Sequence, residues 1–230
     1  MKDVKSLDTK FYHLLTLTFV FCLLISNVAG MKIVDVFGIA QVGGGILFFP
    51  LLYVINDVIT EVYGFSASRR TIWIALFFNI AFSSLMYLLM LLPAGDDWHE
   101  KEAEAFEIIF TLSPRIMLGS LTSYFIGELI NSSIISTLKL QLKGRLFALR
   151  AIFSTLVSSF IESVLFGLIA FYGRIPDDEL IKMTVMLTLL KVMYEIIVIP
   201  FTIIFVNYLK RTERLDSYER PTLAKVFPSW

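Results

Sequence analysis

Two carboxylates stand four residues apart in the middle of an apolar stretch. Asp57 and Glu61 interrupt the run from 43 to 70, and Arg69 and Arg70 close it. At this spacing the two acids share one face of a helix, one turn apart. A carboxylate inside a membrane costs on the order of 3 kcal/mol unless a partner or a cavity receives it. The spacing therefore indicates a site for a proton, a cation or a ligand that donates hydrogen bonds.

Further polar side chains follow at helical spacing in the later apolar runs. Besides Asp57 and Glu61, the candidate binding residues from these stripes are Tyr124, Glu128, Asn131, Glu162, Lys191 and Glu195. In lipid such faces must point at other helices or at a watery cavity. The acids outnumber the one base, and an excess of buried carboxylates is relieved by protonation, a bound cation or a ligand rich in N–H donors. All three are ordinary in a solute or proton-coupled transporter, so the stripes favour a shared pocket at mid-membrane depth.

Two of these candidates also have a purely structural interpretation. Lys191 and Glu195 are four residues apart, so they are positioned to neutralise each other on one helix face. Glu61 lies near the end of its apolar run, where pairing with Arg69 or Arg70 is possible. The pattern leaves both interpretations open beside the binding role.

The composition is not that of an ordinary soluble protein. Of the 230 residues 57% are hydrophobic and only 17% charged, with a mean hydropathy of +0.75, which is typical of an integral helical membrane protein. The single cysteine, Cys22, excludes a disulfide within the chain, and with His13 and His99 it makes no recognisable metal set. Because no catalytic motif such as His-Glu-x-x-His is present either, we expect no catalytic residues, no metal and no cofactor.

The apolar runs predict an all-α, polytopic bundle of six transmembrane helices in one membrane domain covering 1–230. The predicted spans are 11–30, 45–63, 71–92, 114–138, 146–172 and 180–209. Residues 31–44 are too broken to span, so we expect a short hairpin or an interfacial segment there. The acidic stretch 94–113 is predicted to be a solvated loop with at most one amphipathic turn, and the polar tail after 209 to be loosely ordered. On the fourth span, Gly119, Ser123 and Gly127 form a face of small residues that favours close helix packing.

The basic residues predict the orientation. Lys and Arg gather at 2–10, 69–70, 139–150 and 210–225, whereas the alternate connections hold few of them. Because cytoplasmic loops carry the excess of Lys and Arg, we expect a multi-pass protein of the cytoplasmic membrane. Both termini are then cytoplasmic, and the 94–113 loop is external.

Specific runs in the chain resemble a known family. The residues concerned are Ser26-Asn27, Pro50, Asn56-Asp57-Val58-Ile59-Thr60-Glu61-Val62-Tyr63-Gly64, Arg69-Arg70, Phe153-Ser154-Thr155, Glu162, Leu190-Lys191-Val192 and Pro200. Over nearly the whole chain this pattern is similar to the queuosine-precursor transporter family, six-helix proteins of the vitamin-uptake-transporter type. The resemblance implies a fold like the substrate-binding subunits of energy-coupling-factor vitamin importers. It also implies import of 7-cyano-7-deazaguanine and 7-aminomethyl-7-deazaguanine across a bacterial or archaeal cytoplasmic membrane. The run 158–162 departs from relatives that carry Asn and Asp there.

The chemistry of these compounds is compatible with the candidate residues. A guanine edge offers an N–H and an amino group side by side, and a carboxylate accepts both as a bidentate pair. Glu162 or Asp57 would take that edge, Asn27 and Asn131 the carbonyl side, and Lys191 a ring acceptor. The partners that the resemblance implies are a 7-deazaguanine-type small molecule and the lipid bilayer, with no nucleic acid and a possible homo-oligomer.

The energy source and one alternative function stay open. Uptake could use protons through Glu61, Glu128 or Glu195, or could be facilitated passage followed by metabolic trapping. The alternative function is a substrate-binding subunit of a vitamin or nucleobase importer that needs a separate ATPase module, and the Gly119 face is its one sequence hint. An intramembrane enzyme is disfavoured by the missing motifs, and a purely structural protein by the buried acids.

Overall fold

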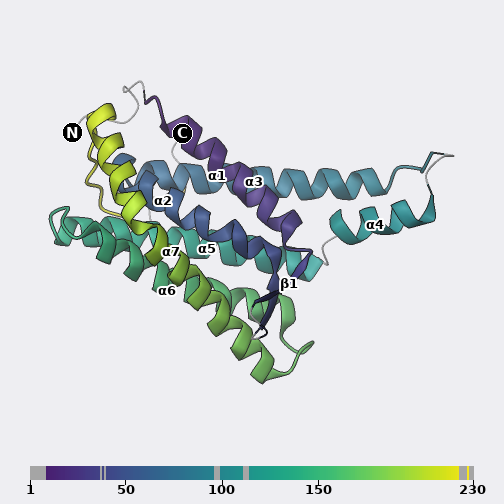
Figure 1. Cartoon of the computed structure of the whole chain (residues 1–230). Coiled ribbons are helices and arrows are strands. Elements are labelled where there is room, and N and C mark those ends of the chain that lie inside the picture. The colour runs from purple at the N-terminus through teal and green to yellow at the C-terminus, as the bar shows by residue number, and fades with distance from the viewer. Residues whose placement is uncertain are drawn as a thin grey trace.

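The chain folds into long helices that run back and forth, with one short hairpin between the first two (Figure 1). The computed structural model describes residues 9–36, 38, 40–95, 99–110, 114–222 and 227. Its elements are α1 (Tyr12–Ala29), β1 (Ile33–Val36), β2 (Ala40–Gly43), the 3-10 helix η2 (Gly44–Leu47), α2 (Phe49–Tyr63), α3 (Phe65–Met90), α4 (Glu100–Phe110), α5 (Pro114–Gln141), α6 (Phe147–Phe171) and α7 (Asp177–Glu213). The prediction of an all-α polytopic protein is therefore confirmed.

The long helices alternate in direction between two ends of the bundle. At one end the Tyr12 hydroxyl of α1 donates to the carbonyl of Ala67 in α3 at 3.1 Å. At the same end Glu61 of α2 contacts Lys139 of α5 and Lys210 of α7, and α6 starts there after a short turn. We call this the tail end, because the chain after α7 packs on it, and we call the opposite end, which carries β1 and β2, the hairpin end.

Five helices in the described part of the chain are long and apolar enough to cross a membrane. They are α1, the continuous stretch Gly44–Tyr63, α3, α6 and α7. The 28-residue α5 runs antiparallel to α6 between the same two ends, but its sequence is more polar. A sixth crossing by α5 stays a prediction, and its position between the other helices supports it.

The central helix is α2, and apolar side chains cover the outside of the bundle. Every residue of α2 from Leu52 to Tyr63 is buried, including Asp57 and Glu61. On the outer helices large apolar side chains point away from the core, for example Leu17, Phe77 and Phe201. Such a surface suits lipid and not water, so the acids of α2 lie on the helix farthest from the bilayer.

Two segments differ from the sequence predictions or resolve them. Residues 31–44 contain the hairpin, in which Ile33 pairs with Gly43. The stretch predicted as a solvated loop instead contains α4, an 11-residue helix with Glu100 and Glu102 in its first turn. Acids there favour a helix because they face the positive end of its dipole. Its side chains make few tertiary contacts, and in Figure 1 it lies beside the far end of α3, away from the bundle.

The start of α3 and the packing of the tail also differ from the predictions, for identifiable reasons. α3 begins at Phe65 and not at 71, because Gly64 adopts φ +94° and turns α2 directly into α3; a left-handed φ suits glycine. Arg69 therefore lies inside α3 and is buried. The described tail residues 214–222 are packed and not loose: the Ser217 N–H donates to the carbonyl of Val62 at 3.1 Å.

Candidate functional site

A cavity of about 830 Å³ lies in the hairpin half of the bundle. It is bounded by α1, the segment of β2 and η2, α5, α6 and α7, and most of its lining is apolar. The lining includes the exposed side chains of Gln41, Glu179 and Lys182, so the cavity reaches the surface at the hairpin end. Its size is in the range of small-molecule sites.

The inner end of the cavity carries an ion pair. Lys191 Nζ of α7 lies 2.8 Å from Glu162 Oε2 of α6, and both side chains are less than a tenth exposed. The Tyr53 hydroxyl of α2 donates a hydrogen bond to the same carboxylate oxygen. The rings of Phe49 and Tyr53 have their centroids 5.6 and 5.5 Å from the ammonium nitrogen. Side chains of α2, α6 and α7 therefore place an ion pair and two aromatic rings next to each other at the inner end of the cavity.

A second polar group lines the cavity on the α1 side. Asn27 Nδ2 donates to Asn79 Oδ1 at 2.9 Å, and the Ser120 hydroxyl donates to Asn27 Oδ1 at 3.4 Å. Asn27 and Ser120 both line the cavity. This arrangement fixes the amide of Asn27 with its polar edge at the cavity wall.

Asp57 and Asn131 lie behind the cavity and do not line it. Asn131 Nδ2 donates to Asp57 Oδ1 at 2.5 Å, and the Ser158 hydroxyl donates to Asn131 Oδ1 at 3.3 Å. Asp57 Oδ2 is buried without a hydrogen-bond partner. The pair is therefore a polar contact between α2 and α5 that retains one unsatisfied carboxylate oxygen.

Glu128 belongs to another buried network between α2, α3 and α5. Asn56 Nδ2 donates to Glu128 Oε2 at 2.6 Å and to Ser132 Oγ at 2.9 Å. The Ser68 hydroxyl donates to Asn56 Oδ1 and lies 2.6 Å from Ser132 Oγ. Tyr124, one turn before Glu128 on α5, donates to a backbone carbonyl of α3 at 3.3 Å. Neither Glu128 nor Tyr124 lines the cavity.

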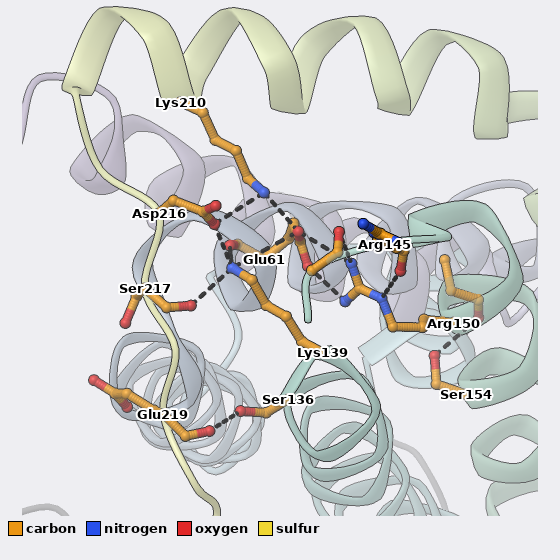
Figure 2. A network of polar contacts seen from close by, with 12 residues as sticks. Glu61, Ser136, Lys139, Arg145, Arg150, Ser154, Lys210, Asp216, Ser217 and Glu219 are labelled. Atoms are coloured by element: carbon orange, nitrogen blue, oxygen red, sulfur yellow. Dashed lines mark hydrogen bonds and ion pairs between the residues drawn. The ribbon is translucent and has the colours of Figure 1, made fainter. Parts of the chain in front are cut away.

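Glu61 lies at the tail end, in the ion network of Figure 2. Its carboxylate is 2.7 Å from Arg150 Nη1, 2.6 Å from Lys210 Nζ and 3.7 Å from Lys139 Nζ. Asp216 of the tail, 2.5 Å from Lys139 and 2.9 Å from Lys210, adds a second acid. Burial raises the pKa of Asp216, but the hydrogen bonds and charges of the two lysines outweigh it and leave that pKa below its ordinary value.

The two structural interpretations from sequence named the wrong partners. Glu61 pairs with cations of α5, α6 and α7 and not with Arg69 or Arg70. Lys191 pairs with Glu162 and not with Glu195. Both carboxylate oxygens of Glu195 are buried without a hydrogen-bond partner.

Of the nine candidate residues, the structure brings three to the cavity and six elsewhere. Those at the cavity are Asn27, Glu162 and Lys191. Sequence reasoning missed Arg150 as a buried partner, although a signal was present. Arg150, Ser154, Ser158 and Glu162 follow one another at four-residue spacing, so the polar stripe of α6 extends from the cavity to the tail end.

The small-residue face of α5 is used inside the chain. A Cβ atom added at Gly119 would lie 3.3 Å from the Cβ of Ala170, and one added at Gly127 would lie 3.0 Å from the Cβ of Glu162. Both neighbours belong to α6. The prediction of close helix packing is therefore confirmed, and the face gives no support to an external ATPase module.

A lipid-suited bundle around an internal cavity with charged groups at its inner end defines a multi-pass helical membrane protein. Residues 43–205 match the family model described as "Putative vitamin uptake transporter". The match covers most of the chain, and the chain belongs to this vitamin uptake transporter family. A protein named "Probable queuosine precursor transporter" from Bacillus subtilis (strain 168) is 26% identical over 183 residues, which cover 79% of this chain and 78% of that protein. No solved structure matches the chain.

Proposed function

We propose that this protein imports the queuosine precursors 7-cyano-7-deazaguanine and 7-aminomethyl-7-deazaguanine. The family and the name of the Bacillus relative support a transporter of such compounds. The observation that carries the proposal is the cavity of about 830 Å³ with a carboxylate and an ammonium group side by side at its inner end. A flat heterocycle with both donors and acceptors on its edge needs that combination.

Each polar group of the cavity has a proposed role. Glu162 accepts the N–H and amino group of the guanine edge as a bidentate pair. Lys191 donates to a ring acceptor and Asn27 to the carbonyl, while Phe49 and Phe166 supply flat apolar walls. Asp57, the other candidate for the guanine edge, is fully buried behind the cavity. The geometry therefore favours Glu162 as the acceptor.

Tyr53 and Lys191 hold the Glu162 carboxylate in place before any ligand binds. Such fixed orientation reduces the cost of ordering the site on binding. We expect ligand N–H groups to replace part of the Lys191 contact, since both lie on the cavity side of the carboxylate. The ammonium group then remains close enough to serve a ring acceptor of the same ligand.

The distribution of charge supports an orientation with the tail end in the cytoplasm. Lys139, Arg150 and Lys210 gather there, and positive side chains favour the cytoplasmic face. The cavity, which reaches the hairpin end, then opens to the outside of the cytoplasmic membrane. This is the state in which an importer receives its substrate.

The experiment is uptake in a cell that cannot make the precursor. Such cells, supplied with 7-cyano-7-deazaguanine, should form queuosine in their tRNA when the protein is present and not when it is absent. Glu162→Gln should lower uptake about tenfold or more, because one charge-assisted hydrogen bond contributes about 1.5–3 kcal/mol. Asp178→Asn, at an exposed site on α7, is the matched control and should transport normally.

Two results would count against the proposal. If no queuosine forms although the protein is confirmed in the membrane, 7-cyano-7-deazaguanine is not the substrate. If Glu162→Gln transports normally, Glu162 is not part of the substrate site. Uptake in a host that lacks any related ATPase module would in addition separate a self-sufficient transporter from a substrate-binding subunit.

A further inference from the structure

Asp57 and Glu195 are buried carboxylates that the cavity chemistry does not use. Both side chains are at most 1% exposed. Asp57 Oδ2 and both oxygens of Glu195 have no hydrogen-bond partner. An unpartnered carboxylate is costly in the interior of a membrane protein. We therefore expect these three oxygens to bind a proton or a cation.

The two acids lie on the packed helices α2 and α7, which also bring Tyr53 and Lys191 to the same oxygen of Glu162. The acidic side chains around Asp57 are those of Glu195, Glu128 and Glu61. On the other sides, Asn131 of α5 donates to Asp57. Tyr194, next to Glu195 in the sequence, has both Glu195 and Cys22 of α1 as titratable neighbours. Two lysines of α7 are committed elsewhere, Lys191 to Glu162 and Lys210 to Glu61.

A proton fits this arrangement better than a metal ion. Two carboxylates that share a site in low dielectric cannot both ionise, so one of them holds a proton. Ca²⁺ and Mg²⁺ need about six or more oxygen ligands, and Zn²⁺ needs about four ligands. The described residues contain no group of three or more acidic, His or Cys side chains that could hold a metal.

The position of this pair links it to the cavity. Tyr53 and Asp57 are four residues apart on α2, and Lys191 and Glu195 are four apart on α7. Tyr53 and Lys191 are the two residues that hold Glu162 at the cavity. On both helices the acid therefore lies about one turn, or about 6 Å along the axis, from the residue that contacts Glu162.

We propose that Asp57 and Glu195 form a proton-binding site that couples uptake to a proton gradient, an inference that rests on the proposed function. With one proton bound, α2 and α7 pack as they do in this structure. When the proton leaves, two negative charges face each other across that interface and drive the helices apart. The same movement shifts Tyr53 and Lys191 away from Glu162 and weakens the hold on the substrate.

The test uses purified full-length protein in liposomes. The wild type should exchange labelled for unlabelled 7-cyano-7-deazaguanine and accumulate it when the interior is alkaline. With one proton per substrate, a gradient of about one pH unit supports up to about tenfold accumulation. Glu195→Gln, which imitates the protonated acid, should keep the exchange and lose the accumulation. Glu195→Asp should restore part of it, and Asp178→Asn should behave as wild type.

The outcomes separate the two claims. If the wild type does not exchange the compound at all, the proposed function fails. If it exchanges but accumulates independently of the pH gradient, or if Glu195→Gln accumulates normally, the coupling site is refuted. Accumulation driven by a sodium gradient at equal pH also contradicts it.

The proton site can also be tested without substrate, so that the test does not depend on a successful exchange experiment. Infrared difference spectra on raising the pH should show loss of a carboxylic acid band in the wild type and not in Glu195→Gln. An unchanged band in both would overturn the proton site itself.

Discussion

At the scale of residues, Glu61 is the anchor of the tail end. One carboxylate receives cations from three helices, through Lys139, Arg150 and Lys210. The guanidinium of Arg150 is bidentate and fully buried. A buried ion pair adds little to protein stability compared with two apolar residues in the same place. Removal of one partner alone is costly, because the other charge is then left buried without a counter-charge.

Glu61→Gln should therefore destabilise the protein strongly. Breaking a buried pair by removal of one partner costs about 3–5 kcal/mol, and Arg150 would keep its charge in the interior. Thermal unfolding in detergent measures the change. Asp178→Asn, which breaks an exposed pair with Lys182, is the control and should cost about 1 kcal/mol or less. Equal melting of the two variants would contradict the importance of the Glu61 network.

The partner of Lys191 shows what residue spacing could not settle. Four-residue spacing on one helix allows a contact with Glu195, but a Lys that precedes a Glu is the weaker order of such a pair. The observed partner, Glu162, comes from α6. The rotation of α6 against α7 decides between the two acids, and helical periodicity within one chain segment does not contain that information.

At the scale of elements, the contact between α5 and α6 sets the position of Glu162. Gly127 lets α5 approach so closely that an added Cβ would lie 3.0 Å from the Cβ of Glu162 and 3.4 Å from its Oε2. Packed helix interfaces give way little, because side chains already fill the space. A methyl group at this point would move the carboxylate away from Lys191 and Tyr53.

Gly127→Ala should therefore lower uptake while it leaves the chemical groups of the cavity unchanged. Misplacement of a binding group by about 1 Å can cost on the order of a hundredfold in favourable cases, so we expect a loss of at least several-fold. Gly95→Ala is the matched control, since an added Cβ there meets nothing within 4 Å. Cell uptake with quantified expression measures both, and normal uptake by Gly127→Ala would contradict the assigned position of Glu162.

Apolar runs predicted where the long helices lie, but they did not predict how their ends are connected. The start of α3 depends on the left-handed φ of Gly64, which composition does not reveal. The tail is polar, and its order comes from contacts distant in sequence, such as Asp216 with Lys139. Glu162 and Lys191 could be chosen as candidates from sequence because charged side chains are rare inside membranes. That they lie together at one cavity could not be predicted, because it depends on how the helices pack.

At the scale of the whole molecule, one end is hollow and the other is closed. The cavity reaches the hairpin end, and the Glu61 network with the tail packed on it occupies the tail end (Figure 2). A transporter must open its two ends in turn around one site. With the tail end in the cytoplasm, as we propose, this arrangement corresponds to an outward-facing state, with Glu162 and Lys191 at the inner end of the cavity.

The most direct test of the account is protection of the cavity by its ligand. Cys22 is the only cysteine in the sequence, so Ile46→Cys in a Cys22→Ser background puts a single thiol in the cavity wall. In intact cells a membrane-impermeant maleimide should label it, and 7-cyano-7-deazaguanine should slow the labelling in this background but not when Glu162→Gln is added. Labelling at the same rate with and without the compound, in a variant that still transports, would contradict the cavity as the substrate site.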